Sequence, residues 1–437
     1  MAWKPVDIWE NNAPILLQEP PSPMNPSYPV PNSLLQHRPF VLYWIARVFA
    51  AFAFQMVGVA VGWQMYALTG NAFDLGLVGL VQFLPAAALV MVAGQLADRY
   101  DRRAILQICQ TIEGLAAAAL AVGSLGGWIG KEFILTALVF LGAARAFEAT
   151  ANQTLLPAVV PVSLFPRAVA ASSSAQQAAT IAGPAVGGLL YALSPGVVYS
   201  IAGAMFVLAA VALTFVPVMR REQNLSARPP VTLEVFFAGI GFIRRNKIVL
   251  GVISLDLFAV FLGGATALLP IFAKDVFDVG PSGLGLLRAA PAVGALGIMV
   301  WLSRASFTRR VGHIEFTAVA CFGLATVVFA VSTSFWLSMA ALATLGAADA
   351  VSVVIRQTLV QLETPDEMRG RVSAVNSLFV GMSNQLGDFR AGMAAALISA
   401  IPAVLVGGIG TLLTVLLCIR MFPELYRVEG FHTIRKP

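Results

Sequence analysis

Long apolar runs of about twenty residues, separated by short polar breaks, recur along most of this 437-residue chain. A helix of that length spans the hydrocarbon core of a membrane and satisfies all of its backbone hydrogen bonds internally. The chain is 58% hydrophobic, which is more apolar side chain than a soluble core of this size could bury. The runs lack the strict alternation of barrel strands, so they predict membrane-spanning helices.

Twelve such runs fit between residues 41 and 422. The expected spans are 41–68, 75–97, 104–127, 133–151, 168–192, 196–217, 248–273, 283–303, 314–331, 335–359, 372–399 and 402–422. The longest break separates six spans from six and ends in "VTLEVFFAGIGFIRR", a pattern typical of an amphipathic helix on the membrane surface. The expected parts are a Pro-rich disordered tail at 1–39, six-helix halves at 40–217 and 248–422, a linker with the amphipathic helix at 218–247, and a tail at 423–437.

The positive side chains divide unevenly between the two sides of the membrane. If the N-terminus is cytoplasmic, the inner connections and tails hold 20 of the 28 Lys and Arg residues, and the outer connections hold only Lys131 and Lys274. Because Lys and Arg near span ends are retained on the cytoplasmic side, both termini are predicted to be cytoplasmic. The net charge of +6 therefore reflects topology, and no nucleic-acid partner is expected.

The two halves also carry an internal repeat. "NQTLLPAVVP" at 152–161 aligns with "RQTLVQLETP" at 356–365, and this register places Arg145 opposite Asp349. Aligning Pro85 with Pro291 gives nearly the same shift. A duplicated six-helix unit is typical of secondary transporters, which place a substrate site near the membrane midplane between the halves.

The charged stretch "GQLADRYDRR", from Gly94 to Arg103, resembles the loop 2-3 signature of the major facilitator superfamily, G-x-L-A-D-R-x-G-R-R, with Asp101 where Gly is usual. Arg145 resembles the superfamily's intramembrane Arg motif, and "GPAVGG" at 183–188 resembles its antiporter-associated motif. The stretches 255–273 and 356–389 are similar to the enterobactin-exporter-like branch of bacterial permeases.

This resemblance implies the two-half, twelve-helix major facilitator fold in a bacterial inner membrane. It also implies a cytoplasmic gate, in which Gly94 lets span 2 approach the second half and Asp98 lies near the N-terminus of span 11, about Arg371, where the helix dipole favours an anion. The gate would latch the halves and stabilise the outward-facing state. Its expected members are Gly94, Asp98, Arg99, Arg102, Arg103 and Arg371.

Charged residues inside the spans are the candidate coupling residues, because a charge in the bilayer is costly and usually faces the bundle interior. Arg145 and Glu148 share one helix face, and Arg47, Asp256 and Asp349 lie on the other spans that line the cavity in this superfamily. Glu148 or Asp256 is predicted to bind and release a proton as the environment changes. The alternative is static ion pairing of Arg145 with Glu148, or of Arg47 with Asp256 or Asp349.

The motif "GPAVGG" is expected to act through backbone geometry. Pro184 removes a backbone donor, and Gly183, Gly187 and Gly188 let a neighbouring helix approach, which predicts a kink or a sliding contact; simple close packing is the alternative. The sequence contains no phosphate-binding loop, nucleophile motif or metal-ligand spacing, so neither an enzyme nor a metal or other cofactor is expected.

The predicted function is secondary active transport by a monomer. Arginines in the expected cavity suit an anionic or amphipathic small molecule, and the resemblance favours proton-coupled export of a siderophore or a hydrophobic drug. Two alternatives remain: import of a small solute, and a receptor or scaffold that has a transporter fold but moves no ligand. Glu113, Arg288, Asp388 and Arg390 are expected to be structural.

Overall fold

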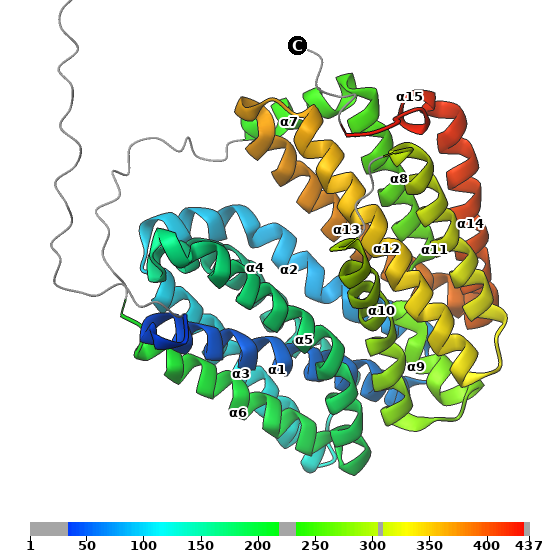
Figure 1. Ribbon diagram of the computed structural model, residues 1–437. Coiled ribbons are helices and arrows are strands. Elements are labelled where there is room, and N and C mark those ends of the chain that lie inside the picture. The colour runs from blue at the N-terminus through cyan, green and yellow to red at the C-terminus, as the bar shows by residue number, and fades with distance from the viewer. Residues whose placement is uncertain (1–33, 218–232, 305–308, 432–437) are drawn as a thin grey trace, which may run out of the picture.

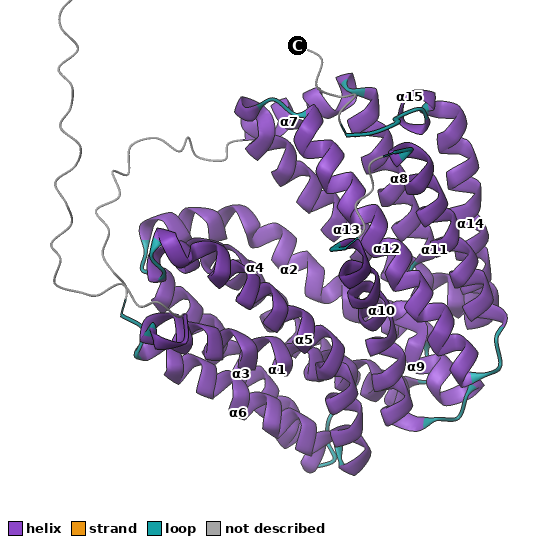
Figure 2. Ribbon diagram, in the orientation of Figure 1, coloured by secondary structure: helices purple, strands orange, loops and turns teal. Residues whose placement is uncertain are grey.

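The computed structural model describes residues 34–217, 233–304 and 309–431, and in this part of the chain all regular structure is helical (Figure 2). The first group of helices is η1 (Leu34–Gln36), α1 (Arg38–Thr69), α2 (Ala72–Arg99), α3 (Arg102–Leu125), α4 (Lys131–Val159), η2 (Val162–Leu164), α5 (Phe165–Leu193) and α6 (Pro195–Thr214). The rest are α7 (Leu233–Arg245), α8 (Lys247–Gly263), η3 (Thr266–Leu268), α9 (Leu269–Ile271), η4 (Phe272–Val276), α10 (Gly280–Leu302), α11 (Val311–Val331), α12 (Phe335–Glu363), α13 (Asp366–Ile398), α14 (Ala400–Met421) and α15 (Pro423–Tyr426).

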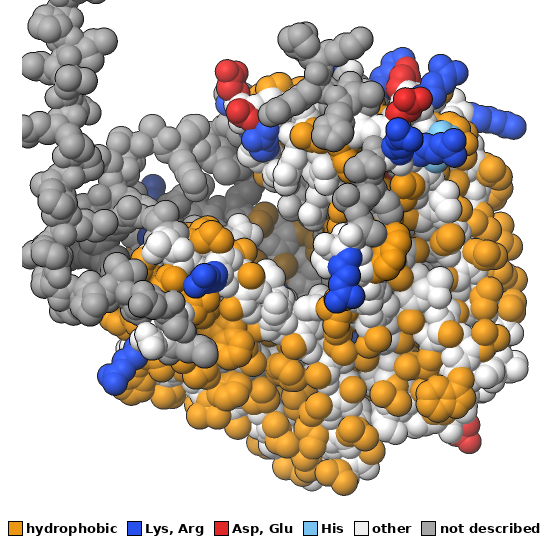
Figure 3. Space-filling model, in the orientation of Figure 1, with side chains coloured by type: hydrophobic (Ala, Val, Ile, Leu, Met, Phe, Trp, Pro, Cys, Tyr) orange, Lys and Arg blue, Asp and Glu red, His pale blue; other side chains and the backbone are white. Residues whose placement is uncertain are grey.

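Ten segments of the described chain are long and apolar enough to cross a membrane, and each overlaps an expected span. The other two expected spans correspond to α5 and α13, which are long helices but carry more polar side chains. Exposed hydrophobic side chains cover the flanks of the molecule, while the Lys and Arg seen in this view lie toward its upper and left side and none is visible along its lower edge (Figure 3). The chain is therefore an all-α, multi-pass membrane protein.

Three boundaries differ from the expectation. Helix α1 begins at Arg38, inside the segment expected to be a disordered tail, because Pro39 fits the first turn of a helix, where no N–H is needed. Residues 1–33 of that segment, and residues 218–232 of the linker, lie outside the described residues. Helix α4 runs on to Val159, so Asn152 lies well inside it.

The third difference is that the expected span 248–273 is broken. Helix α8 ends at Gly263, and the chain continues through η3 and α9 to the π-helical turn η4. Arg390 of α13 donates to the exposed carbonyls of Phe261 (2.9 Å) and Leu262 (2.5 Å), and so satisfies backbone groups that the break leaves without helical partners. The Thr266 hydroxyl donates to Asp388 at 2.9 Å, which fits the structural role expected of these α13 residues.

The helices form two groups (Figure 1). In the first, α1 packs against α5 and α6, and α3 packs against α4 and α6. In the second, α14 packs against α8 and α11, and α12 packs against α10 and α11. The groups meet along two helix pairs, α5 with α10 and α2 with α13, and diverge toward the end that carries the α2–α3 and α4–α5 connections (Figure 1). Helix α7, where the sequence predicts an amphipathic helix, packs against α13 and α8.

Glycines allow the close contacts between the groups. A Cβ on Gly392 would lie 2.6 Å from the Cα of Gly76, and a Cβ on Gly188 would lie 3.0 Å from the Cα of Gly285. Gly183 and Gly187 face α1 in the same way. Helix α5 continues through Pro184, so these contacts are those of close packing, and the kink and sliding roles of "GPAVGG" stay predictions.

The closed end is also joined by polar contacts between α1 and η4. The Tyr66 hydroxyl donates a hydrogen bond to the Asp275 carboxylate, and the Lys274 ammonium lies 5.3 Å from the centre of the Tyr66 ring. The molecule is therefore open at the end with the α2–α3 connection and closed at the opposite end.

Candidate functional site

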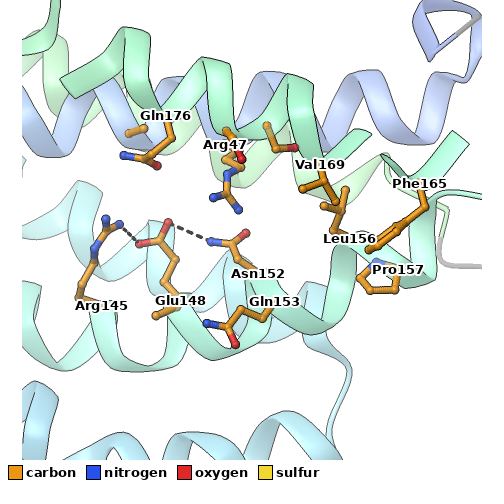
Figure 4. A pocket seen from close by; sticks show the side chains of 14 residues that line it. Arg47, Arg145, Glu148, Asn152, Gln153, Leu156, Pro157, Phe165, Val169 and Gln176 are labelled. Carbon is orange, nitrogen blue, oxygen red and sulfur yellow. Dashed lines mark hydrogen bonds and ion pairs between the residues drawn. The ribbon is translucent and has the colours of Figure 1, made fainter. Parts of the chain in front are cut away.

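A cavity of about 480 Å³ lies between α1, α4 and α5 in the first helix group (Figure 4). We call it the N-terminal cavity. Its lining residues are Arg47, Ala51, Arg145, Glu148, Ala149, Asn152, Gln153, Leu156, Pro157, Phe165, Val169, Ser172, Ser173 and Gln176. The charged and amide side chains of α1 and α4 lie toward one end, and Leu156, Pro157, Phe165 and Val169 gather at the other (Figure 4). The cavity is thus polar at one end and apolar at the other.

Arg145 and Glu148 form an ion pair one helical turn apart, with Nη1 and Oε2 separated by 2.6 Å. The other carboxylate oxygen of Glu148 accepts from Asn152 Nδ2 (3.3 Å) and from Gln110 Nε2 (3.4 Å). The Arg145 guanidinium also lies over the Phe54 ring of α1, 4.3 Å from its centre. The static pair considered as the alternative to coupling is therefore present in this conformation.

Arg47 has no carboxylate partner within the described residues. Its Nη1 donates to the Tyr43 hydroxyl at 3.3 Å, and that hydroxyl donates to Asn152 Oδ1 at 3.2 Å. Its Nε is buried without a hydrogen-bond partner. The expected pairs of Arg47 with Asp256 or Asp349 do not form here, because those two residues belong to the other helix group. With Glu148 balancing Arg145, the N-terminal cavity keeps one uncompensated positive charge.

Asp256 instead pairs with Arg356, an arrangement that the sequence analysis did not predict. Their Oδ2 and Nη1 atoms are 3.1 Å apart, and both side chains are almost fully buried. Asp256, Asp349 and Ser352 line a second cavity of only about 10 Å³ in the second helix group. The candidate coupling residues thus fall into two separate places: Arg47, Arg145 and Glu148 in one, Asp256 and Asp349 in the other.

Glu315 of α11 is a further member of the second place. It is fully buried, and its Oε1 accepts a 2.7 Å hydrogen bond from Ser352. In the sequence it lies in the first turn of an expected span, where an acidic side chain is normally exposed at the membrane surface. Helix α11 begins earlier, at Val311, so Glu315 lies deeper in the helix and is buried. We call Asp256, Glu315, Asp349, Ser352 and Arg356 the acidic cluster.

Glu113 of α3 is the counterpart of Glu315 in the first helix group. It is also fully buried, and neither of its carboxyl oxygens has a hydrogen-bond partner in the described structure. The sequence analysis assigned it a structural role. The fold places it next to the Arg145–Glu148 pair, and no local feature of the sequence predicts that position.

The signature loop is ordered by its own side chains. Asp101 caps α3, accepting from the Arg103 backbone N–H at 2.9 Å, and its φ of −63° explains why glycine is not required there. Arg102 Nε donates to the Ala97 carbonyl at 3.2 Å, and Arg103 Nη1 donates to the Val216 carbonyl at 3.0 Å, near the ends of α2 and α6. Both arginines therefore stabilise helix ends in this conformation.

The cytoplasmic gate is not assembled here. A Cβ on Gly94 would meet nothing within 4 Å, Arg99 is exposed, and the side chain of Asp98 lies outside the described residues. The expected start of span 11 near Arg371 is wrong, because α13 begins at Asp366, directly after Pro365. Since the helix groups diverge at this end, the gate stays a prediction for the opposite conformation.

An all-helical membrane protein built from two helix groups, with a polar cavity inside the first group, has the architecture of a transporter. Residues 43–387 match the family model described as Major Facilitator Superfamily, and the chain belongs to this family. Its similarity to the enterobactin exporter EntS of Shigella boydii serotype 4 is 28% identity over 392 residues, covering 87% of this chain and 88% of that protein. EntS of Escherichia coli O139:H28 is 27% identical over the same length.

Solved structures share the fold at low sequence identity. A bacterial homologue of the human lysosomal transporter Spinster, in an inward-facing and occupied conformation, superposes with a TM-score of 0.68 at 13% identity, covering 92% of this chain and 99% of that one. The nucleoside transporter NupG gives a TM-score of 0.69 at 14% identity, covering 88% and 99%. These matches confirm the major facilitator fold expected from the sequence.

Proposed function

We propose that the protein is a secondary active exporter of an amphipathic small molecule with an anionic group, driven by protons through alternating access. The observation that carries the proposal is the unbalanced charge of Arg47 in a cavity whose far end is apolar. The curated relatives are named as enterobactin exporters, which supports export as the direction. A siderophore or an amphipathic drug is the substrate class that fits best.

The cavity can hold such a molecule by two separate interactions. A guanidinium donates bidentate, charge-assisted hydrogen bonds to planar anions, and Arg47 has donor capacity left after its contact with Tyr43. Leu156, Phe165 and Val169 then offer an apolar surface for the rest of the ligand. The volume of about 480 Å³ lies within the range of small-molecule sites, roughly 300 to 1,000 Å³.

The cavity becomes accessible from the opposite side of the membrane if the two helix groups rock about their glycine contacts. In this conformation the Tyr66–Asp275 contact lies at the closed end, while the gate residues at the other end are apart. The positive-inside distribution supports a cytoplasmic location for the open end. The conformation is then inward-facing, ready to load substrate from the cytoplasm, and the reverse conformation releases it outside.

The test begins with a deletion strain. Cells lacking the protein should secrete less iron-chelating compound or become more susceptible to amphipathic drugs, and a plasmid copy should restore the phenotype. The Arg47→Gln variant should fail to restore it, whereas Arg167→Gln, which changes an exposed arginine on α5, should succeed. Normal export by Arg47→Gln would overturn the cavity assignment. Reduced uptake in the deletion strain would indicate import, and binding without movement in liposomes would indicate a receptor.

A further inference from the structure

The acidic cluster forms a connected polar site inside the second helix group. Asp256 pairs with Arg356 at 3.1 Å, and Ser352 bridges from the small cavity beside Asp256 and Asp349 to the Glu315 carboxyl at 2.7 Å. These side chains come from α8, α11 and α12. None of them lines the N-terminal cavity.

The charges of this site do not balance. The charged groups that the packed helices contribute are Asp256 from α8, Glu315 from α11, and Asp349 and Arg356 from α12; α13 adds only the neutral Asn376, which accepts from Arg356 at 3.4 Å. Three carboxyl groups thus share one guanidinium. Glu315 and Asp256 are 0% and 4% exposed, so water does not reach these two carboxyl groups, whereas Asp349 is partly exposed. An uncompensated negative charge at such a buried position costs several kcal/mol, so the cluster needs a positive ligand.

The geometry limits what that ligand is. The cavity of about 10 Å³ is no larger than one water molecule. Within the described chain, no three acidic, His or Cys side chains stand close enough to hold a metal ion. Glu315 Oε2 is fully buried and has no hydrogen-bond partner, so a carboxyl oxygen is available to carry a proton.

Building on the proposed exporter function, we propose that the acidic cluster binds the coupling proton, held between Asp349 and Glu315 while Arg356 keeps Asp256 ionised. Ser352 is a positioning residue that fixes the Glu315 carboxyl. The site lies apart from the N-terminal cavity, so the two helix groups divide proton binding and substrate binding between them.

The sign of the coupling favours this cluster over Glu148. Exchange requires that the proton and the substrate bind in alternation. Protonating Glu148 would release Arg145 from its 2.6 Å ion pair and leave the N-terminal cavity more positive, which would strengthen the binding of an anion. A proton on Glu148 would therefore travel with an anionic substrate, whereas a proton in the acidic cluster has no direct contact with the substrate and acts through conformation.

The expected span 248–273 connects the acidic cluster with the closed end of the molecule. Asp256 lies on α8, and the same span continues through η3 and α9 to η4, whose Asp275 accepts from Tyr66. Arg356 lies on α12, which packs against α10. Neutralising the cluster changes the attraction between α8 and α12 and so biases the helices that close this end.

The experiment titrates the purified full-length protein in detergent and follows the C=O stretch of protonated carboxyl groups by infrared difference spectroscopy. Wild type should show a titrating buried-carboxyl component. Glu315→Gln and Asp349→Asn should each reduce and shift this component, and the double variant should lose the part that the cluster contributes, leaving the signal of other buried carboxyl groups such as Glu113. Glu315→Asp should restore it, and Ser352→Ala should displace its midpoint. The control Glu424→Gln, which removes an exposed carboxylate paired with Lys247, should leave it unchanged.

Three results would overturn the inference. The first is a double variant, folded by thermal unfolding, that titrates like wild type. The second is a midpoint that moves when Na⁺ replaces a bulky organic cation, because the ligand would then be Na⁺. The third is unchanged proton dependence of export in the double variant. The titration needs no substrate, so it fails or succeeds independently of the deletion-strain test of export.

Discussion

Replacing Arg356 by Met is expected to destabilise the protein by about 3 to 5 kcal/mol at neutral pH, the usual cost of leaving one partner of a buried ion pair without its counterion. The side chains of Arg356 and Asp256 are 4% and 5% exposed, so water cannot replace the lost partner. The variant leaves three carboxyl groups without a cation. Lowering the pH should protonate them, and the destabilisation should shrink as the pH falls.

The complementary variant, Asp256→Asn, should cost clearly less. Arg356 cannot lose its proton, but Glu315 and Asp349 lie in the same cluster and can ionise to balance it. At an effective dielectric constant of about 20, a charge about 4 Å away contributes roughly 4 kcal/mol, so even partial compensation by one carboxylate recovers most of the loss. We therefore expect a cost of roughly 1 to 2 kcal/mol at neutral pH, which should increase as the pH falls and these carboxyl groups are protonated.

Equilibrium unfolding in mixed micelles, followed by circular dichroism at several pH values, measures both variants against wild type. The double variant Arg356→Met with Asp256→Asn should be less destabilised than Arg356→Met alone, because one uncompensated charge is removed. Equal losses for the two single variants, unchanged between acidic and neutral pH, would show that Glu315 and Asp349 do not share the charge of Arg356.

Two further predictions concern the contacts between the helix groups. Tyr66→Phe removes the hydrogen bond to Asp275, and a bond to a charged group contributes about 1.5 to 3 kcal/mol. Spin-label distances across the closed end should therefore show roughly ten- to a hundredfold more of the open form. Tyr100→Phe at the opposite end is the control, and no shift would count against the contact as a closure. Gly188→Leu should slow transport sharply without unfolding the protein, since its side chain would enter the backbone of α10. Gly297→Leu on α10 is the control, because a side chain there would meet open space. Substrate flux in proteoliposomes compares the two glycine variants, and equal rates would contradict the packing argument.

Much of the fold follows from local properties of the sequence. Hydropathy placed all ten segments of the described chain that are long and apolar enough to cross a membrane, because such a segment is apolar whatever its neighbours are. The break after Gly263 was missed because the segment stays apolar through Pro270, so hydropathy alone does not change there. The sequence does not explain why Asp101 replaces the usual Gly of the signature. The structure does, because Asp101 caps α3 by accepting from the backbone N–H of Arg103.

Pairing between helices was beyond the sequence. Arg356 and Asp256 are both recognisable as charges in apolar spans, yet nothing local says that α8 and α12 bring them to 3.1 Å. The sequence predicts one set of charged residues around a shared cavity, whereas the structure places them in two separate groups, one in each helix group. Glu315 was overlooked for the related reason that a shift of three residues in a helix start turns an apparent end residue into a buried one.

The division itself follows from how the repeat has diverged. At the aligned positions of α4 and α12, Arg145 stands opposite Asp349 and Asn152 stands opposite Arg356, so one helix begins its polar stripe with a cation and the other with an anion. The residues that line the N-terminal cavity keep one unbalanced positive charge, and the acidic cluster has an excess of carboxyl groups. A duplicated unit can thus recognise an anion on one side and a proton on the other without the two ligands touching. Coupling then depends only on the shared conformational change, and substitutions at Arg47 should alter substrate affinity while leaving the titration of the acidic cluster in place.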